Sequence, residues 1–84
     1  MREILWSEEK NLKLKKERGA SFEDIIAGEF LGIENNPSRD NQKFMLFAVN
    51  NYVWVVPYVD DEKRYFLKTA FPSRKHTKIY LKGT

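Results

Sequence analysis

The feature that most constrains this chain is a pair of strongly apolar runs, 44–49 and 52–58, separated only by Asn50 and Asn51. Aromatic and β-branched residues dominate both runs, and such residues favour strands. Asparagine tolerates a positive φ, so the two asparagines are typical of a tight hairpin turn. Because both runs are apolar on both faces, we expect a central hairpin that other elements cover on each side. Pro57 lacks a backbone donor, so we expect an edge or a bulge near that end of its strand.

Cap and turn residues place further elements on either side of the hairpin. Ser7 and Gly19 are typical caps for a first, mostly polar helix. Ser21 is typical of the cap of a second helix, which we expect to extend through Phe30 and to end at Gly32. Beyond these helices we expect a short strand in 31–36, a third long strand at 64–71 and a short final helix over 73–81.

These elements together predict an α+β fold. Two N-terminal helices pack on one face of an antiparallel sheet of three or four strands, and the short C-terminal helix lies beside the last strand. With 84 residues, the chain is expected to form a single domain over 1–84.

Several classes of protein are excluded by composition. The chain contains no cysteine and one histidine, His76, which excludes disulfides and a structural zinc site of cysteine and histidine ligands. We expect no cofactor and no metal. No apolar run reaches the roughly 18 residues of a membrane span, and the first residues lack the apolar core of a secretion signal. We therefore expect a soluble, cytoplasmic protein that does not enter a membrane.

Charge is distributed unevenly along the chain. Residues 1–62 carry 8 Lys and Arg against 12 Asp and Glu, whereas residues 63–84 carry 7 Lys and Arg and no acid. The net charge is therefore −4 in the first segment and +7 in the second. Such an asymmetry indicates that the C-terminal segment meets a polyanion or an acidic partner.

A local pattern near the N-terminus carries a family resemblance. It consists of a tryptophan, a lysine four residues later, and a glycine followed by the string A-S-F-E-D, which are Trp6, Lys10, Gly19, Ala20, Ser21, Phe22, Glu23 and Asp24. The pattern resembles the BrnT family of bacterial toxins, part of the RelE-like superfamily. The string YFLKTAF followed by PSRKHTK is similar to that family's last strand and basic close. The chain departs from the usual pattern at Arg18, where histidine is common, and at Leu14, where asparagine is common.

The resemblance implies the toxin component of a type II toxin–antitoxin system. Such toxins are compact α+β ribonucleases that cleave RNA without a metal. The implied partners are RNA and a cognate antitoxin protein, typically a small ribbon-helix-helix protein encoded beside the toxin.

The candidate catalytic residues lie in the C-terminal segment. Metal-free RNA cleavage needs a base for the 2′-hydroxyl proton and an acid for the leaving oxygen, and the imidazole of His76 suits either role. Arg74 and Lys75 are predicted to hold the phosphate, and Tyr80 to donate a phenolic proton or stack on a base. The alternative is that neither residue is catalytic: His76 is then an exposed helix histidine, and Tyr80 only packs its ring.

The candidate RNA-binding residues are Arg64, Lys68, Phe66 and Lys78. Even spacing predicts that Arg64, Phe66 and Lys68 share one face of the third strand, together with Ala70. With the cations of the final helix they would form one positive groove, in which Phe66 could stack on a base. The alternatives are an edge strand protected by its charges and a solvated basic helix. At the level of function, the alternative is a non-catalytic basic module that binds an acidic protein partner or nucleic acid.

Overall fold

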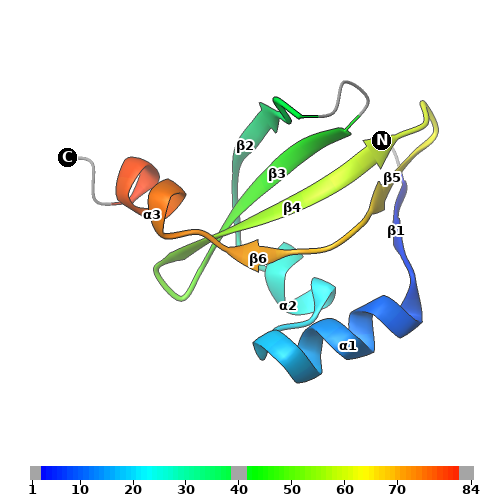
Figure 1. Cartoon of the computed structure of the whole chain (residues 1–84), viewed down its shortest axis with the longest axis horizontal. Coiled ribbons are helices and arrows are strands. Elements are labelled where there is room, and N and C mark those ends of the chain that lie inside the picture. Colours follow the sequence, from blue (N-terminus) through cyan, green and yellow to red (C-terminus); the bar gives the residue numbers. More distant parts are fainter. Residues whose placement is uncertain (1–2, 39–41, 82–84) are drawn as a thin grey trace.

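The central hairpin forms as the sequence predicts. In the computed structural model, which describes residues 3–38 and 42–81, strand β3 (Gln42–Val49) pairs antiparallel with β4 (Tyr52–Asp60). Asn50 and Asn51 adopt φ values of 53° and 64°, which is the positive region that a tight turn of this kind requires. The hairpin forms the middle of the sheet (Figure 1).

The sheet is larger than expected and its strands are mixed in direction. The described residues form six strands, in the order β1-β5-β4-β3-β2, with β6 paired to β4 outside this path. The added members are β1 (Glu3–Trp6), β2 (Glu29–Asn35), β5 (Arg64–Leu67) and β6 (Phe71–Pro72). The expectation of a purely antiparallel sheet of three or four strands was wrong, because β1 pairs parallel with β5 at the opposite end of the sequence. A parallel pairing of such distant segments leaves no local pattern in the sequence.

The expected third strand, 64–71, is divided in two. β5 pairs with the end of β4 at Tyr58–Asp60, and β6 pairs with Trp54 and Val55. Pro57 lies between the two pairings, and its carbonyl accepts the Lys68 N–H at 2.9 Å. Since proline has no N–H to complete the ladder, the interruption falls where an edge or bulge was expected.

The first helix forms as predicted, but the second ends early. α1 (Glu8–Arg18) is capped by Ser7 and closed by Gly19 at φ 81°, and α2 (Phe22–Ile26) begins with a capping box between Ser21 and Asp24. The chain then turns into β2, so Phe30 is a strand residue. The part of the second helix that was expected to extend through Phe30 and end at Gly32 does not form. A Cβ at Gly28 would collide with the Ala48 carbonyl oxygen. This close approach to β3 requires a glycine where the chain leaves α2.

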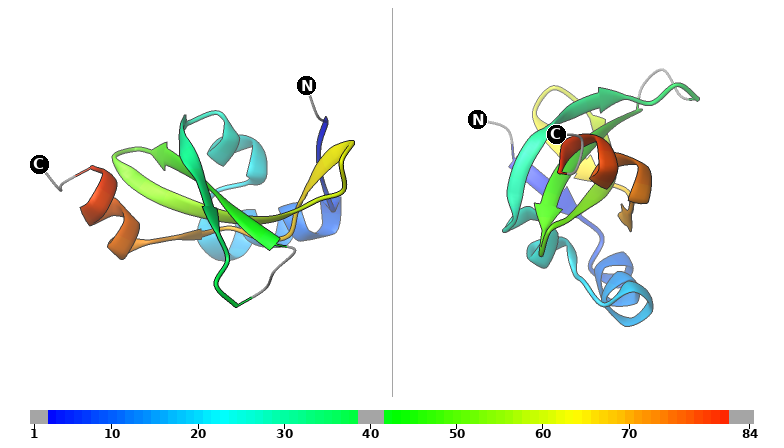
Figure 2. Two further views of the ribbon diagram at one scale, coloured as in Figure 1. Left: turned by 90° about the horizontal axis from the view of Figure 1, so that it is seen from above. Right: turned by 90° about the vertical axis from the view of Figure 1, so that its left-hand side faces the viewer.

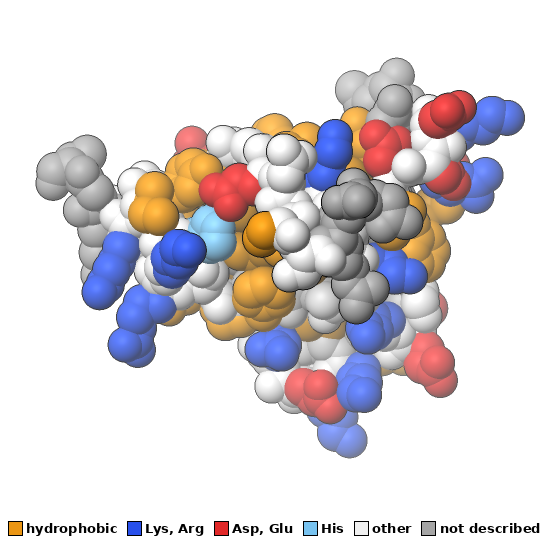
Figure 3. Space-filling model, turned by 45° about the horizontal axis from the view of Figure 1, so that its top comes forward, with side chains coloured by type: hydrophobic (Ala, Val, Ile, Leu, Met, Phe, Trp, Pro, Cys, Tyr) orange, Lys and Arg blue, Asp and Glu red, His pale blue; other side chains and the backbone are white. Residues whose placement is uncertain are grey.

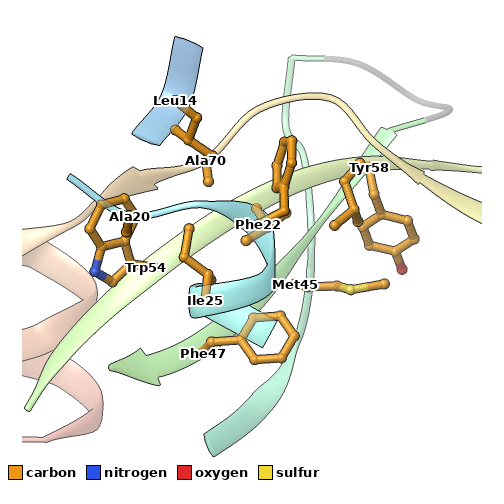
Figure 4. Packing of buried hydrophobic residues seen from close by; sticks show 11 residues of the cluster. Leu14, Ala20, Phe22, Ile25, Met45, Phe47, Trp54, Tyr58 and Ala70 are labelled. Atoms are coloured by element: carbon orange, nitrogen blue, oxygen red, sulfur yellow. The ribbon is translucent and has the colours of Figure 1, made fainter. Parts of the chain in front are cut away.

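Helices cover both faces of the sheet rather than one. The larger core lies on the α1–α2 face, where Phe22 and Ile25 pack against Met45, Trp54 and other side chains of the hairpin (Figure 4). On the opposite face, α3 (Arg74–Tyr80) lies over a smaller cluster of Leu46, Val53 and Val55, to which Phe71 and Leu81 are added. Figure 2 shows α3 at one end of the molecule, away from α1. We call this second side the α3 face.

A buried asparagine joins the two N-terminal helices. Asn11 is only 6% exposed, and its Oδ1 accepts the buried Phe22 N–H at 2.7 Å. Its Nδ2 donates to Glu23 Oε1 at 2.7 Å, and this bond is the largest cause of the lowered pKa of Glu23. The loop between α1 and α2 is thus held by one polar side chain inside the core. Within the described ranges, no helix is long and apolar enough to cross a membrane.

We predict that Asn11→Ala lowers the free energy of unfolding by about 1–3 kcal/mol, because it leaves the buried Phe22 N–H without an acceptor. The control is Leu12→Ala on the same helix, where the side chain is 69% exposed and the change should stay within about 0.5 kcal/mol. Urea denaturation of the three proteins measures the difference. Equal stability of the two variants would contradict the structural role of Asn11.

Candidate acid–base site

The final helix is attached to the sheet by its own first residues. Ser73 caps α3 by accepting the His76 N–H, and its backbone N–H donates to the Val53 carbonyl at 2.9 Å. Thr77, which is 3% exposed, accepts the Val53 N–H at 2.8 Å and donates to the Ser73 carbonyl at 2.7 Å. The prediction that Ser73 caps a folded helix is confirmed. α3 nevertheless packs against β4 rather than beside β5.

Two side chains of α3 converge on one carboxylate of the sheet, and the cap residue Ser73 contacts one of them. The His76 Nε2 lies 3.0 Å from Glu34 Oε1, and the Tyr80 hydroxyl donates to Glu34 Oε2 at 2.9 Å. On its other side, His76 Nδ1 lies 2.7 Å from the Ser73 hydroxyl. The imidazole and the phenol ring are stacked, with centroids 6.4 Å apart. We call Glu34, Ser73, His76 and Tyr80 the acid–base cluster.

Glu34 reaches α3 because of a bulge in β2. Phe30 is opposite Phe47 and Gly32 is opposite Leu46, so Leu31 is an extra residue. Without the bulge, alternation would direct Glu34 to the α1–α2 face. Gly32 adopts φ 147°, a conformation that residues with a side chain rarely adopt. The glycine bulge therefore reverses the face from which the following side chains of β2 project, and this brings Glu34 to His76.

Hydrogen bonds shift the titration of the cluster. The hydrogen bond from His76 is the largest cause of the lowered pKa of Glu34. Burial has the next largest effect and raises the pKa, whereas Tyr80 and the charge of Lys75 add smaller effects that lower it. The Glu34 carboxylate in turn raises the pKa of Tyr80, because it accepts a hydrogen bond from the neutral phenol. At neutral pH the cluster thus contains an ionised carboxylate and a neutral phenol.

The geometry around His76 serves both of its protonation states. When Nδ1 is bare, it accepts the Ser73 hydroxyl proton while Nε2–H donates to Glu34. When Nδ1 carries a proton, that N–H donates to the Ser73 oxygen instead. Both ring nitrogens of His76 therefore have a hydrogen-bond partner within the fold.

The cluster is accessible and has cations beside it. The His76 side chain is 15% exposed, whereas the Glu34 side chain is 37% exposed. Arg74, Lys75 and Lys78 are exposed on α3. Figure 3 shows the histidine at the surface with an acidic side chain beside it, and Lys and Arg side chains gathered at the α3 end. The four predicted catalytic residues Arg74, Lys75, His76 and Tyr80 therefore lie on one short helix together with the predicted RNA-binding residue Lys78, and His76 and Tyr80 contact Glu34.

The other predicted RNA-binding residues lie elsewhere. Arg64 and Phe66 are exposed on β5 while Leu67 is buried, so the predicted alternation is confirmed for these positions. Ala70 is fully buried, because the strand ends at Leu67. α3 begins near Val53 and β5 pairs with the far end of β4 (Figure 1), so the cations of α3 and of β5 do not form the single groove expected from the sequence.

Comparison with known proteins adds no assignment. No family model matches the chain, and neither curated proteins nor solved structures provide a match. The resemblance to BrnT toxins therefore depends on the residues quoted above. Among the described residues, no three histidine, cysteine or acidic side chains are grouped as a metal site would need.

Sequence analysis did not identify Glu34 as a functional residue. It lies in an unremarkable acidic stretch of an edge strand, 42 residues before His76. The one local signal was Gly32, because a glycine inside a strand indicates a bulge. That signal is lost when Gly32 is taken as the end of the second helix.

We predict that Glu34→Gln lowers stability at neutral pH and that this loss disappears in acid. Because the folded state lowers the pKa of Glu34, the stabilisation is present above 4.5 and is lost as the pH falls through the lowered pKa. Unfolding free energies at pH 7 and at lower pH values measure the difference from the wild type. The hydrogen bond with Lys15 lowers the pKa of Asp24 to about 2. This contribution is the same in the wild type and in Glu34→Gln, so it cancels in the difference between their unfolding free energies.

The matched control is Glu29→Gln, which changes an exposed glutamate of the same strand. At pH 7, Glu34→Gln should differ from the wild type more than Glu29→Gln does. A pH-independent effect of Glu34→Gln would show that the carboxylate charge does not stabilise the fold.

Proposed function

We propose that the protein is a metal-independent endoribonuclease whose acid–base pair is Glu34 and His76. The observation that carries this proposal is the 3.0 Å contact between a carboxylate and an imidazole, beside exposed cations. Cleavage of RNA at its own 2′-hydroxyl requires one group that accepts a proton and one that donates a proton. The cluster supplies both on a partly exposed surface.

In the proposed reaction, an RNA phosphate binds at the exposed side of Glu34 and His76, and the hydrogen bond between these two side chains opens to admit it. Glu34 takes the proton of the 2′-hydroxyl, and the 2′-oxygen forms a bond to the adjacent phosphorus. The bond from phosphorus to the 5′-oxygen breaks, and protonated His76 gives that oxygen a proton. The products are a 2′,3′-cyclic phosphate, which water can open to a 3′-phosphate, and a 5′-hydroxyl end.

Two other features of the site support this chemistry. The pentacoordinate phosphorus carries additional negative charge in the transition state. Lys75, whose charge already acts on Glu34, is the α3 cation proposed to stabilise it. Arg74 and Lys78 each lie two residues from His76 on the helix, and we propose that they bind RNA phosphates outside the cluster. Tyr80 holds the second oxygen of Glu34 at 2.9 Å and so orients the carboxylate. The Ser73 hydroxyl caps α3 through the His76 N–H, which assigns it a positioning role.

The same contacts also suit a non-catalytic basic module. In that case the acid–base cluster only fastens α3 to β2, and the cations bind nucleic acid or an acidic protein. All side-chain polar atoms buried among the described residues are already satisfied, so a purely structural role is physically complete. An assay of bond cleavage distinguishes the two functions.

We predict that the purified protein cleaves a long single-stranded RNA in EDTA. His76→Ala and Glu34→Gln should each reduce turnover by about 10²–10⁴-fold, because each removes a proton-transfer group. Glu29→Gln is the matched control and should cleave at the wild-type rate. Binding of a strand with 2′-O-methyl sugars, which cannot be cleaved, should be unchanged in His76→Ala.

Two results would contradict the proposed chemistry. Equal turnover of the wild type and both variants removes the acid–base pair from the mechanism. Complete loss of cleavage in EDTA shows that a metal is required.

We further propose that the protein is the toxin of a type II toxin–antitoxin pair, as the family resemblance implies. A ribonuclease must be inhibited in the cell that makes it. The net charge of +7 over residues 63–84 suits an acidic segment of an antitoxin, because complementary charge guides association. A small ribbon-helix-helix protein encoded beside the gene is the expected partner.

Expression of the wild type in a bacterium is expected to arrest growth and deplete intact messenger RNA. Glu34→Gln, produced at the same level, should relieve both effects, because the toxicity requires the proton acceptor. Co-expression of the adjacent gene should relieve them in the wild type. Strong expression of the wild type with normal growth would overturn the toxin assignment.

A further inference from the structure

A second cationic surface is lined by residues of α1 and of the end of β5. Figure 2 shows α1 away from α3. It is a cleft of about 510 Å³, and the residues that matter here are Lys10 and Lys13 of α1, Phe66 and Lys68 at β5, and one carboxylate, Glu9. The Lys68 ammonium lies 5.4 Å from the centre of the Phe66 ring. We call this surface the α1–β5 cleft.

The chemistry of the cleft selects its ligand. Three ammonium groups and one carboxylate line the cleft, so the cleft favours an anion. Phe66 is 36% exposed and presents an aromatic side chain among these cations. Single-stranded nucleic acid supplies both complements, because its bases are free to stack on an aromatic ring while its phosphates meet lysines. A duplex keeps its bases stacked inside and cannot use Phe66 in this way.

The strand register relates the cleft to the acid–base cluster. Glu34 is opposite Phe44, and Phe44 is opposite Pro57, so all three project from the α3 face. Phe66 is opposite Val59, two residues beyond Pro57, and therefore projects from the same face, next to the end of β5 at Leu67. The cleft lies at this end of the strand, where α1 also reaches it. Three strand spacings across the sheet and two residues along it separate Glu34 from Phe66 by roughly 16 Å. A stacked strand that advances about 3.4 Å per nucleotide spans this distance in about five nucleotides.

We propose that the α1–β5 cleft is a second subsite for the RNA strand that is cleaved at Glu34 and His76. A base stacks on Phe66, and the neighbouring phosphates contact Lys10, Lys13 and Lys68. This inference rests on the proposed ribonuclease function and specifies its substrate as single-stranded RNA that extends about five nucleotides from the cleaved bond. It also gives Lys68, which directly follows β5, a role in binding although α3 does not lie beside it.

The test is binding of a fluorescein-labelled, eight-nucleotide RNA with 2′-O-methyl sugars, measured by fluorescence anisotropy on the full chain. Phe66→Ala should weaken binding about 5- to 100-fold, because it removes the stacking surface. Phe66→Leu, which retains apolar bulk, should weaken it similarly. The control is Phe30→Ala, since Phe30 is 53% exposed but projects from the opposite face of the sheet.

The lysines are tested by salt dependence. Lys10→Gln and Lys13→Gln should each weaken binding and reduce the slope of log K against log salt by about 0.7, the value for one phosphate contact with a single strand. Lys16→Gln, on the same helix but outside the cleft, should leave the slope unchanged. Circular dichroism and thermal unfolding confirm that each variant is folded.

The outcomes separate this inference from the proposed function. Binding that depends on Phe66, with unmodified RNA left intact, supports the subsite and overturns the nuclease. Cleavage of RNA with binding that is equal in Phe66→Ala and Phe30→Ala supports the nuclease and overturns the subsite. Binding of an eight-base-pair RNA duplex as tightly as the single strand also overturns the subsite.

Discussion

The register between β3 and β4 is the constraint on which the other elements depend. Met45 is opposite Val56 and both face α1 and α2, whereas Leu46 is opposite Val55 and both face α3. Because side chains alternate across a strand, a slip of one residue would exchange the two faces and bury each set against the wrong helices. The positive φ of Asn50 and Asn51 fixes this register locally. The hairpin is thus the centre of the sheet, and its two apolar faces determine on which side each helix packs.

The acid–base cluster depends on a second, smaller constraint at the sheet edge. The bulge at Gly32 changes the phase of β2, and only then does Glu34 share a face with α3. Backbone conformation at one glycine therefore decides whether a carboxylate meets His76 and Tyr80 or lies on the opposite side of the sheet. The anchoring of α3 through Thr77 and Val53 supplies the other half of the geometry. The site is held by backbone features on two elements that are separated in the sequence.

Positive charge is distributed differently in space than along the sequence. The C-terminal segment is strongly basic, but its cations are divided between α3 and β5 at the two ends of β4. Lys10 and Lys13, which belong to the net acidic first part of the chain, join Lys68 in one cleft. These cations therefore lie at both ends of the sheet rather than in one groove. Net charge over a segment does not predict this arrangement, because folding brings distant segments together.

The sequence alone determined the hairpin, the limits of α1 and the capped start of α3, since each is specified by neighbouring residues: Asn50-Asn51, Ser7 with Gly19, and Ser73. It also determined the alternation of Phe66 and Leu67 on β5. Tertiary structure decided the early end of α2, where Gly28 must approach Ala48, and the parallel pairing of β1 with β5. It also decided that α3 covers the opposite face, and it brought Glu34 to His76. Local signals act over a few residues through caps, turns and alternation, whereas these features depend on contacts between segments far apart in the chain, whose energies no short pattern records.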